Sequence, residues 1–102
     1  MSFIFAYITN PDKKHAKKVA LHLLKKKLVA CVNLFPIESL YWWDGKIEES
    51  KEYALIVKTK KENWNKLKTE VKKIHSYTIP CITKINVSAN KEYEDWLRSV
   101  VK

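Results

Sequence analysis

One stretch of the chain, residues 28–58, constrains the fold more than any other, because it reads as strand almost throughout and reverses direction once. The reversal falls at Asp44-Gly45, and Gly45 is the only glycine in the sequence. An Asp-Gly pair is typical of a two-residue hairpin turn of type I′, in which both central residues have positive φ. The sequence therefore predicts a single hairpin with unusually long arms.

Arms of this length are too long for a small domain to cover. Ordinary strands run about 5–6 residues, so the end of the hairpin should protrude from the rest of the chain. The protruding end carries Tyr41, Trp42 and Trp43. Exposed aromatic strand edges favour pairing with another chain, and burial of such rings is a main source of interface energy. We therefore expect an oligomer in which the subunits shelter each other's hairpins.

The chain before the hairpin contains one strand and one helix. Residues 3–8 form an apolar run suited to a central strand. Asn10 is expected to cap a helix with Pro11 at its first position, and apolar residues recur at helical spacing through residues 16–24. Within the hairpin, Pro36 cannot donate to a ladder, so an edge strand or a bulge is expected there.

A second helix, a fourth strand and a third helix follow the hairpin. Thr59 and Glu62 have the spacing of a capping box, and an apolar stripe continues through residues 64–74. After a loop, residues 81–87 have strand character, and a last helix is expected to be capped by Asn90. The order β-α-β-β-α-β plus a terminal helix predicts an α+β, ferredoxin-like domain.

The composition fits a single domain spanning residues 1–102 that works in a reducing compartment. Hydrophobic residues make up 46% of the chain and charged residues 30%, which is typical of a globular protein. Cys31 and Cys81 lie in apolar, strand-like runs, where reduced core cysteines are commoner than a disulfide. Neither a signal peptide nor an apolar run long enough to span a bilayer is recognisable. We expect a cytoplasmic protein with no membrane contact.

The net charge of +9 raises the question of nucleic acid. Nearly all the cationic residues are lysines, which crowd the first predicted helix and are spread over the second, and Arg98 is the only arginine. Specific base or phosphate recognition usually relies on arginine, so we expect a solvated lysine face and no specific nucleic-acid partner. An RNA-binding module of RRM-like topology is the alternative function, since it shares the β-α-β-β-α-β order. Residues 53–58, the third strand, lack the glycine and the aromatic pair of the RRM signature.

Several segments resemble the CutA divalent-cation tolerance proteins, with matching spacing over essentially the whole chain. They are Ala30-Cys31-Val32-Asn33, residues 39–48, Glu52 with residues 55–59, the loop His75-Ser76-Tyr77-Thr78-Ile79-Pro80, and Tyr93 with Trp96-Leu97. The resemblance implies a homotrimer akin to the PII signalling proteins, with the long hairpins building the trimer. It also implies a role in tolerance of copper and other divalent metals, and no defined enzymatic reaction.

The same resemblance bears on metal ligands. His75 and Cys31 stand at matching positions, whereas a cysteine that some members carry at the end of the first strand is Ile8 here. Cys31 is either a thiolate ligand for a thiophilic metal or a small buried hydrophobe. Glu52, in an acidic segment of the returning arm, is either a ligand for a hard metal or an ion-pair partner for lysine. We expect no required cofactor, and weak binding of a divalent metal, copper above all.

The remaining candidate residues belong to a ligand cleft or to the trimer interface. For the three aromatic residues of the hairpin tip, interface packing is favoured over stacking on a base or an apolar ligand. A third hypothesis is an enzyme in which Lys58, Tyr77 and Glu52 meet at an inter-subunit cleft. No catalytic motif supports it, because one glycine leaves no room for a phosphate-binding loop. The sequence therefore predicts a binding protein and not an enzyme.

Overall fold

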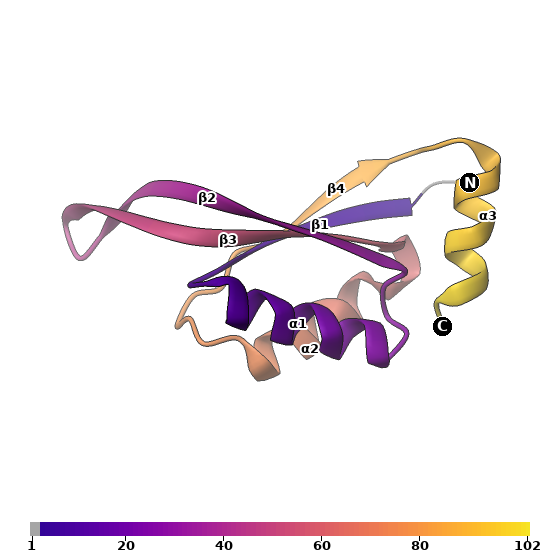
Figure 1. The fold of residues 1–102 in the computed structure, drawn as a ribbon, viewed down its shortest axis with the longest axis horizontal. Helices are drawn as coiled ribbons and strands as arrows, with labels where there is room; N and C mark the ends of the chain where they lie inside the picture. Colours follow the sequence, from indigo (N-terminus) through magenta and orange to yellow (C-terminus); the bar gives the residue numbers. More distant parts are fainter. Residues whose placement is uncertain (1–2) are drawn as a thin grey trace.

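The computed structural model describes residues 3–102, which form a four-stranded sheet with three α-helices (Figure 1). In chain order the elements are β1 (Phe3–Asn10), α1 (Lys13–Lys25), β2 (Cys31–Trp43), β3 (Lys46–Lys60), the 3-10 turn η1 (Lys61–Asn63), α2 (Trp64–Ile74), β4 (Ile82–Val87) and α3 (Lys91–Val100). The strand order is β2-β3-β1-β4, and every neighbouring pair is antiparallel. This arrangement confirms the ferredoxin-like α+β fold with a long hairpin and an extra C-terminal helix.

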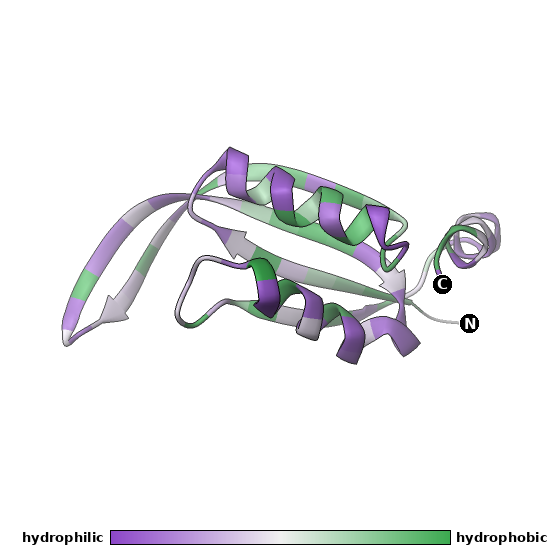
Figure 2. Ribbon diagram, turned by 90° about the horizontal axis from the view of Figure 1, so that it is seen from below, coloured by the Kyte–Doolittle hydropathy of each residue, from purple (hydrophilic) through white to green (hydrophobic). Residues whose placement is uncertain are grey.

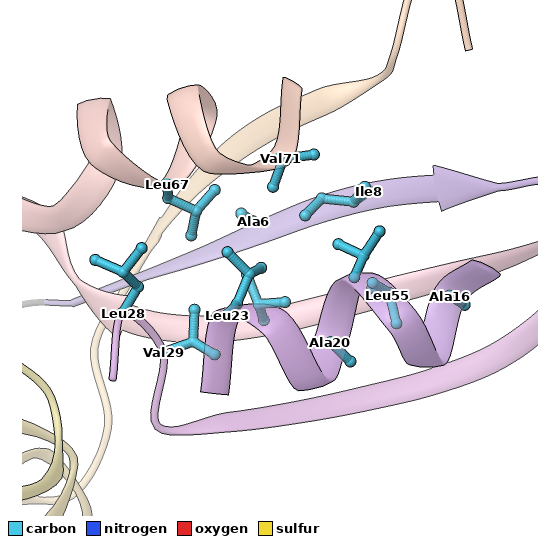
Figure 3. Packing of buried hydrophobic residues seen from close by; sticks show 12 residues of the cluster. Ala6, Ile8, Ala16, Ala20, Leu23, Leu28, Val29, Leu55, Leu67 and Val71 are labelled. Carbon is cyan, nitrogen blue, oxygen red and sulfur yellow. The ribbon is translucent and has the colours of Figure 1, made fainter. Parts of the chain in front are cut away.

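Helices α1 and α2 cover one face of the sheet and leave the other face without a helical layer over most of its length (Figures 1 and 2). Figure 3 shows Leu23 of α1 and Leu67 of α2 in one buried cluster with Ile8 of β1 and Leu55 of β3. These four side chains are fully buried. Burial of one such side chain stabilises a fold by about 1.5–3 kcal/mol, so the helix-covered face supplies the core. None of the helices within residues 3–102 is long and apolar enough to cross a membrane.

The hairpin has the geometry that the single glycine indicates. Strand β2 has 13 residues and β3 has 15, and their pairing runs without a break from Cys31 opposite Lys58 to Trp43 opposite Lys46. At the turn φ is 51° for Asp44 and 74° for Gly45, the signs that a type I′ turn requires. The tip extends well beyond both helices (Figure 2), and the chain measures 45 Å along its longest axis.

Pro36 fits into β2 without a bulge. It lies opposite Tyr53 in an uninterrupted register. Strand β2 is at the edge of the sheet, where a residue without an N–H group costs no ladder hydrogen bond on its outer side. Of the two outcomes expected at this proline, the edge strand is confirmed.

The start of α1 differs from the sequence prediction. The cap is Asp12, whose Oδ1 accepts from the His15 N–H at 2.9 Å. Asn10 is instead the last residue of β1 and is fully buried, and its Nδ2 donates to the Ile8 and Tyr53 carbonyls, each at 3.3 Å. Strand pairing continues to this position, so the amide binds backbone of the sheet and not of the helix.

The expected capping box at α2 is also wrong. Thr59 belongs to β3, and its hydroxyl donates to the Leu28 carbonyl at 2.6 Å. Asn63 Nδ2 donates to the same carbonyl at 3.3 Å and to Thr59 Oγ1 at 3.1 Å. Glu62 accepts from Arg98 of α3 at 3.1 Å. Thr59 is thus part of a buried network that ties β3 to the loop before β2. Helix α2 begins only at Trp64, after the 3-10 turn η1.

The part of the chain from Cys81 to its end corrects two smaller expectations. Asn90 precedes α3 but makes no capping bond to the helix backbone; the Glu94 carboxylate accepts from the Ala89 N–H at 2.9 Å instead. Cys81 lies just before β4 and is exposed, whereas a core position was expected. Cys31 is partly buried, and both thiols are free.

Candidate functional site

A cleft of about 620 Å³ forms where the hairpin leaves the body of the sheet, on the face without helices. Three elements and one loop supply its walls. They are β1 with Tyr7 and Thr9, β2 with Ser39, Tyr41 and Trp43, β3 with Glu52, and the loop between α2 and β4 with residues 76–79 and Cys81. A cleft of this volume lies within the range of small-molecule sites in proteins, about 300–1,000 Å³.

The two-residue period of β2 decides which tip aromatics reach this cleft. Alternate side chains of a strand point to opposite faces, so Tyr41 and Trp43 share the cleft side. Trp42 lies on the other face of the hairpin, opposite Ile47, and is 72% exposed. The Ser50 hydroxyl donates to Tyr41 Oη at 3.4 Å, which ties the Tyr41 ring to the facing arm. Two of the three aromatics named from the sequence therefore belong to the cleft.

Glu52 and Tyr77 form the polar centre of the cleft. The Tyr77 hydroxyl donates to Glu52 Oε2, and Glu52 is only 8% exposed. Burial raises the pKa of Tyr77 well above its usual value, and the bond to Glu52 raises it further. The proton therefore stays on the phenol at neutral pH, and the carboxylate is the acceptor. Burial also raises the pKa of Tyr7, with smaller contributions from nearby Cys81 and Glu52.

His75 holds the cleft loop in place through both ring nitrogens. Its Nε2 lies 2.7 Å from the Thr9 carbonyl oxygen, and its Nδ1 lies 3.1 Å from the Tyr77 backbone nitrogen. A carbonyl only accepts and an amide N–H only donates, so the ring is neutral with its proton on Nε2. The His75 ring also packs on the Tyr77 ring, with 4.9 Å between centroids. His75 thus connects α2 to β1 and positions Tyr77 over Glu52.

Cys31 and Lys58 lie away from this cleft. They face each other at the far end of the β2–β3 ladder, six residue positions from the pair of Ile37 and Glu52. At ~3.3 Å per residue this separation is about 20 Å. The Lys58 ammonium lies over the rings of Phe5 and Tyr93, at 5.5 and 5.8 Å from their centroids, so it belongs to the packing of α3 against the sheet.

The three metal ligands expected from the sequence are therefore not gathered into one site. Glu52 and His75 both border Tyr77, but both nitrogens of His75 are engaged, and Cys31 is remote. Within residues 3–102 no group of three or more His, Cys, Asp or Glu side chains is arranged to hold a metal ion. The donors of this chain consequently do not fit a closed metal centre, for which three or four protein ligands are typical.

A second hollow, of about 740 Å³, lies beside the start of α1. Its walls include Asp12, Glu38, Lys51 and Tyr53. Among residues 3–102, the only aromatic residue in its lining is Tyr53, and the hollow shares Glu52 with the first cleft. The cleft at Glu52 concentrates more of the candidate residues and is the better functional site.

The sequence did not single out Tyr7, Thr9 or Ser39 as site residues. Tyr7 and Thr9 come from the first strand, and only the pairing of β1 with β3 brings them near Glu52. The sequence could have indicated Ser39, because it lies two and four residues before Tyr41 and Trp43 on the same strand, so the three side chains point to one face.

Comparison with known proteins identifies the family. The model of the CutA1 divalent ion tolerance protein matches residues 4–100. The divalent-cation tolerance protein CutA of Archaeoglobus fulgidus is 50% identical over 99 residues, which cover 96% of this chain and 97% of that protein. Its counterpart in Pyrococcus horikoshii is 45% identical over 95 residues, covering 92% and 93%.

Solved structures agree over the whole chain. A structure described as the periplasmic divalent cation tolerance protein CutA from Archaeoglobus fulgidus superposes with a TM-score of 0.96 at 48% identity and covers 100% of both chains. The PII-like protein CutA from Nostoc gives a TM-score of 0.91 at 28% identity and covers 100% of this chain and 98% of that one. None of these names describes an enzyme. The chain therefore belongs to the CutA1 divalent ion tolerance protein family.

Proposed function

We propose that this protein is a homotrimer that takes part in tolerance of, or response to, divalent metals through weak binding of a divalent cation, with no catalytic activity. The main observation that supports the proposed assembly is that no helix within residues 3–102 covers one face of the sheet over most of its length (Figure 1). On that face Phe5 lies opposite Ile85 of β4, and Tyr7 lies opposite Ile56 of β3. An open face with apolar side chains of this kind marks an interaction surface.

The hairpin supports the same proposal. Its outer half buries almost nothing within one chain, and Leu40, Trp42 and Ile47 are each more than 60% exposed. Large exposed apolar side chains on a strand edge mark an interaction surface. A second copy of the chain is the partner that supplies a matching apolar face. The resemblance to the CutA proteins supports an assembly of three copies.

For the metal, we propose a weak and copper-preferring site at Glu52 and His75. Glu52 offers one carboxylate, and His75 can coordinate only after one of its two hydrogen bonds breaks. Few ligands and a lost hydrogen bond both reduce affinity, and with little geometric selection the order of affinities follows the general series in which Cu²⁺ leads. Cys31 contributes nothing to this site, since it lies about 20 Å along the ladder.

Calorimetric titration of Cu²⁺ and Zn²⁺ tests the metal proposal. We expect weak binding with Cu²⁺ ahead of Zn²⁺, weaker binding in His75→Ala, and no change in His15→Ala, whose imidazole is exposed on α1. The affinity should fall as the pH drops through the histidine range, because only a neutral imidazole coordinates. An unchanged copper affinity in His75→Ala would remove this residue from the site.

A cytoplasmic location completes the proposal. Both cysteines are free, and persistent free thiols are typical of reducing compartments. The related Archaeoglobus fulgidus structure is described as periplasmic, so cell fractionation decides between the two. Recovery of the protein outside the cytoplasmic fraction would contradict the assignment.

The RNA-binding alternative gains no support from the arrangement of the sheet. An RRM stacks bases on aromatic side chains of its central strands. Of the two central strands, β1 presents Phe5 and Tyr7 on the open face, but the Lys58 ammonium lies over the Phe5 ring, 5.5 Å from its centroid. Strand β3 presents Ala54 and Ile56 there, neither of which is aromatic.

A further inference from the structure

Glu52 is a buried carboxylate with no cationic partner among residues 3–102. It is 8% exposed, and the hydrogen bond it receives comes from the neutral phenol of Tyr77. The ion pairs of the described chain lie elsewhere, and none joins a Lys, Arg or His nitrogen to Glu52 within 4.0 Å. Acidic residues are almost never buried unless they are paired. The carboxylate of Glu52 therefore lacks a counter-charge.

Aromatic rings surround this carboxylate. Tyr7, Tyr41, Trp43 and Tyr77 border the same cleft, and they come from β1, β2 and the loop after α2. The face of an aromatic ring carries partial negative charge and attracts cations, most strongly for tryptophan. The charge of Glu52 and the ring faces thus favour the same kind of ligand, one that is positive and has apolar surface.

We propose that this cleft binds a small organic cation of the alkylated ammonium class. Its charged nitrogen would lie beside Glu52, and its alkyl groups would contact the rings of Tyr41, Trp43 and Tyr77. The inference goes beyond the metal proposal, because a bound metal ion is coordinated by several protein ligands at once. An alkylammonium ion needs no such set, since one carboxylate and the ring faces hold it.

The remaining lining of the cleft agrees with this ligand. Thr9, Ser39, Ser76 and Thr78 are neutral hydroxyl residues, so they add no positive charge that would repel a cation. Aromatic cages of this composition are the known means by which proteins recognise quaternary ammonium groups. The volume of about 620 Å³ leaves room for such a ligand.

Titration with choline and with 3,3-dimethylbutan-1-ol tests the proposal. These two probes have almost the same shape and differ in the charge of the central atom. The titrations are made with the full chain in chelator, so that no metal is involved, and are followed by calorimetry. We expect choline to bind and the neutral alcohol to bind at least about tenfold more weakly, a difference of about 1.4 kcal/mol. Equal affinity for both probes, or no binding of choline at millimolar concentration, would overturn the proposal.

Variants localise the site. Glu52→Gln keeps the shape and an acceptor for Tyr77 but removes the charge, and it should weaken choline binding by about tenfold or more. Trp43→Leu should weaken it as well, whereas Trp96→Leu should not. Trp96 lies on α3, away from the cleft and the hairpin, and is as exposed as Trp43, so it is the matched control. Equal effects of the two tryptophan variants would contradict the assignment to the cleft.

The assembly state of each variant is checked by light scattering and thermal unfolding. A fall in choline affinity counts for the proposal only when the variant keeps the mass and the melting temperature of the wild type. If a lysine of a second subunit is the true counter-charge, choline will not bind, and Glu52→Gln will lower the melting temperature of the assembly. That result would overturn the ligand proposal and would leave the metal titration of His75→Ala unaffected.

Discussion

Replacing Thr59 by valine should destabilise the protein although the change keeps the size and branching of the side chain. The Thr59 hydroxyl donates to the Leu28 carbonyl at 2.6 Å and accepts from Asn63 Nδ2 at 3.1 Å, and all three residues are buried. In the variant the carbonyl keeps only the longer bond from Asn63, and the amide loses one acceptor. An unsatisfied buried polar group costs about 1–3 kcal/mol. The methyl group that replaces the hydroxyl returns up to ~1 kcal/mol, so we expect a net loss of about 1 kcal/mol.

Equilibrium unfolding in guanidinium chloride, with all samples at the same protein concentration, measures this loss. The concentration must be fixed because the stability of an oligomer depends on it. Thr69→Val is the matched control, since Thr69 lies on the exposed surface of α2 and its hydroxyl bonds only to the Asn65 carbonyl. The control should stay within about 0.5 kcal/mol of the wild type.

Glu62→Ala separates the two accounts of this region. In a capping box Glu62 would act together with Thr59, and loss of its side chain would cost about 1 kcal/mol. In the structure it accepts from Arg98 at the surface, and an exposed pair is worth about 0–1 kcal/mol. A neutral Thr59→Val together with a clearly destabilising Glu62→Ala would refute the buried network.

Two further predictions concern the turn and the helix pair. Gly45→Ala should lower the free energy of unfolding by about 1–2 kcal/mol. The loss comes from the positive φ of 74° alone, since an added Cβ meets nothing within 4 Å. Gly45→Asn should lose less, and equal melting temperatures for the two variants would contradict this reason. Glu70 accepts from Lys73, His22 and Lys26, which lowers its pKa to about 2 from 4.5. Its ion pairs should therefore stabilise the folded protein above about pH 4.5 and lose their effect as the pH falls through about 2. Unfolding measured as a function of pH should show Glu70→Gln less stable than the wild type at neutral pH. The two proteins should become equally stable near pH 2.

Much of the fold could be predicted from periodicity and from one turn. The apolar stripes identified α1 and α2, and Asp44-Gly45 identified the hairpin. Element boundaries were less predictable, because the side chains of Asn10 and Thr59 have two possible backbone partners. Both residue types are good helix caps in isolation, but both are buried in the folded chain and bind carbonyls that are distant in sequence, Tyr53 and Leu28.

The site was predicted less completely, since its contacts join distant parts of the chain. The sequence indicated Glu52, His75 and Tyr77 as residues of interest, but not that Tyr77 would bond to Glu52, 25 positions away. His75 reaches the Thr9 carbonyl across 66 positions. A local sequence pattern cannot predict a contact between residues so far apart. The bond to the Thr9 carbonyl occupies the imidazole, which is therefore not available as a free ligand.

The molar mass of the protein in solution tests the central claim most directly. It is measured by light scattering at micromolar protein concentration, with and without chelator. The account predicts three times the subunit mass of 12.1 kDa under both conditions. Burial of apolar side chains on the open sheet face and of Leu40, Trp42 and Ile47 on the hairpin drives assembly without metal. A stable particle of 12.1 kDa, or a trimer that dissociates in chelator, would contradict it.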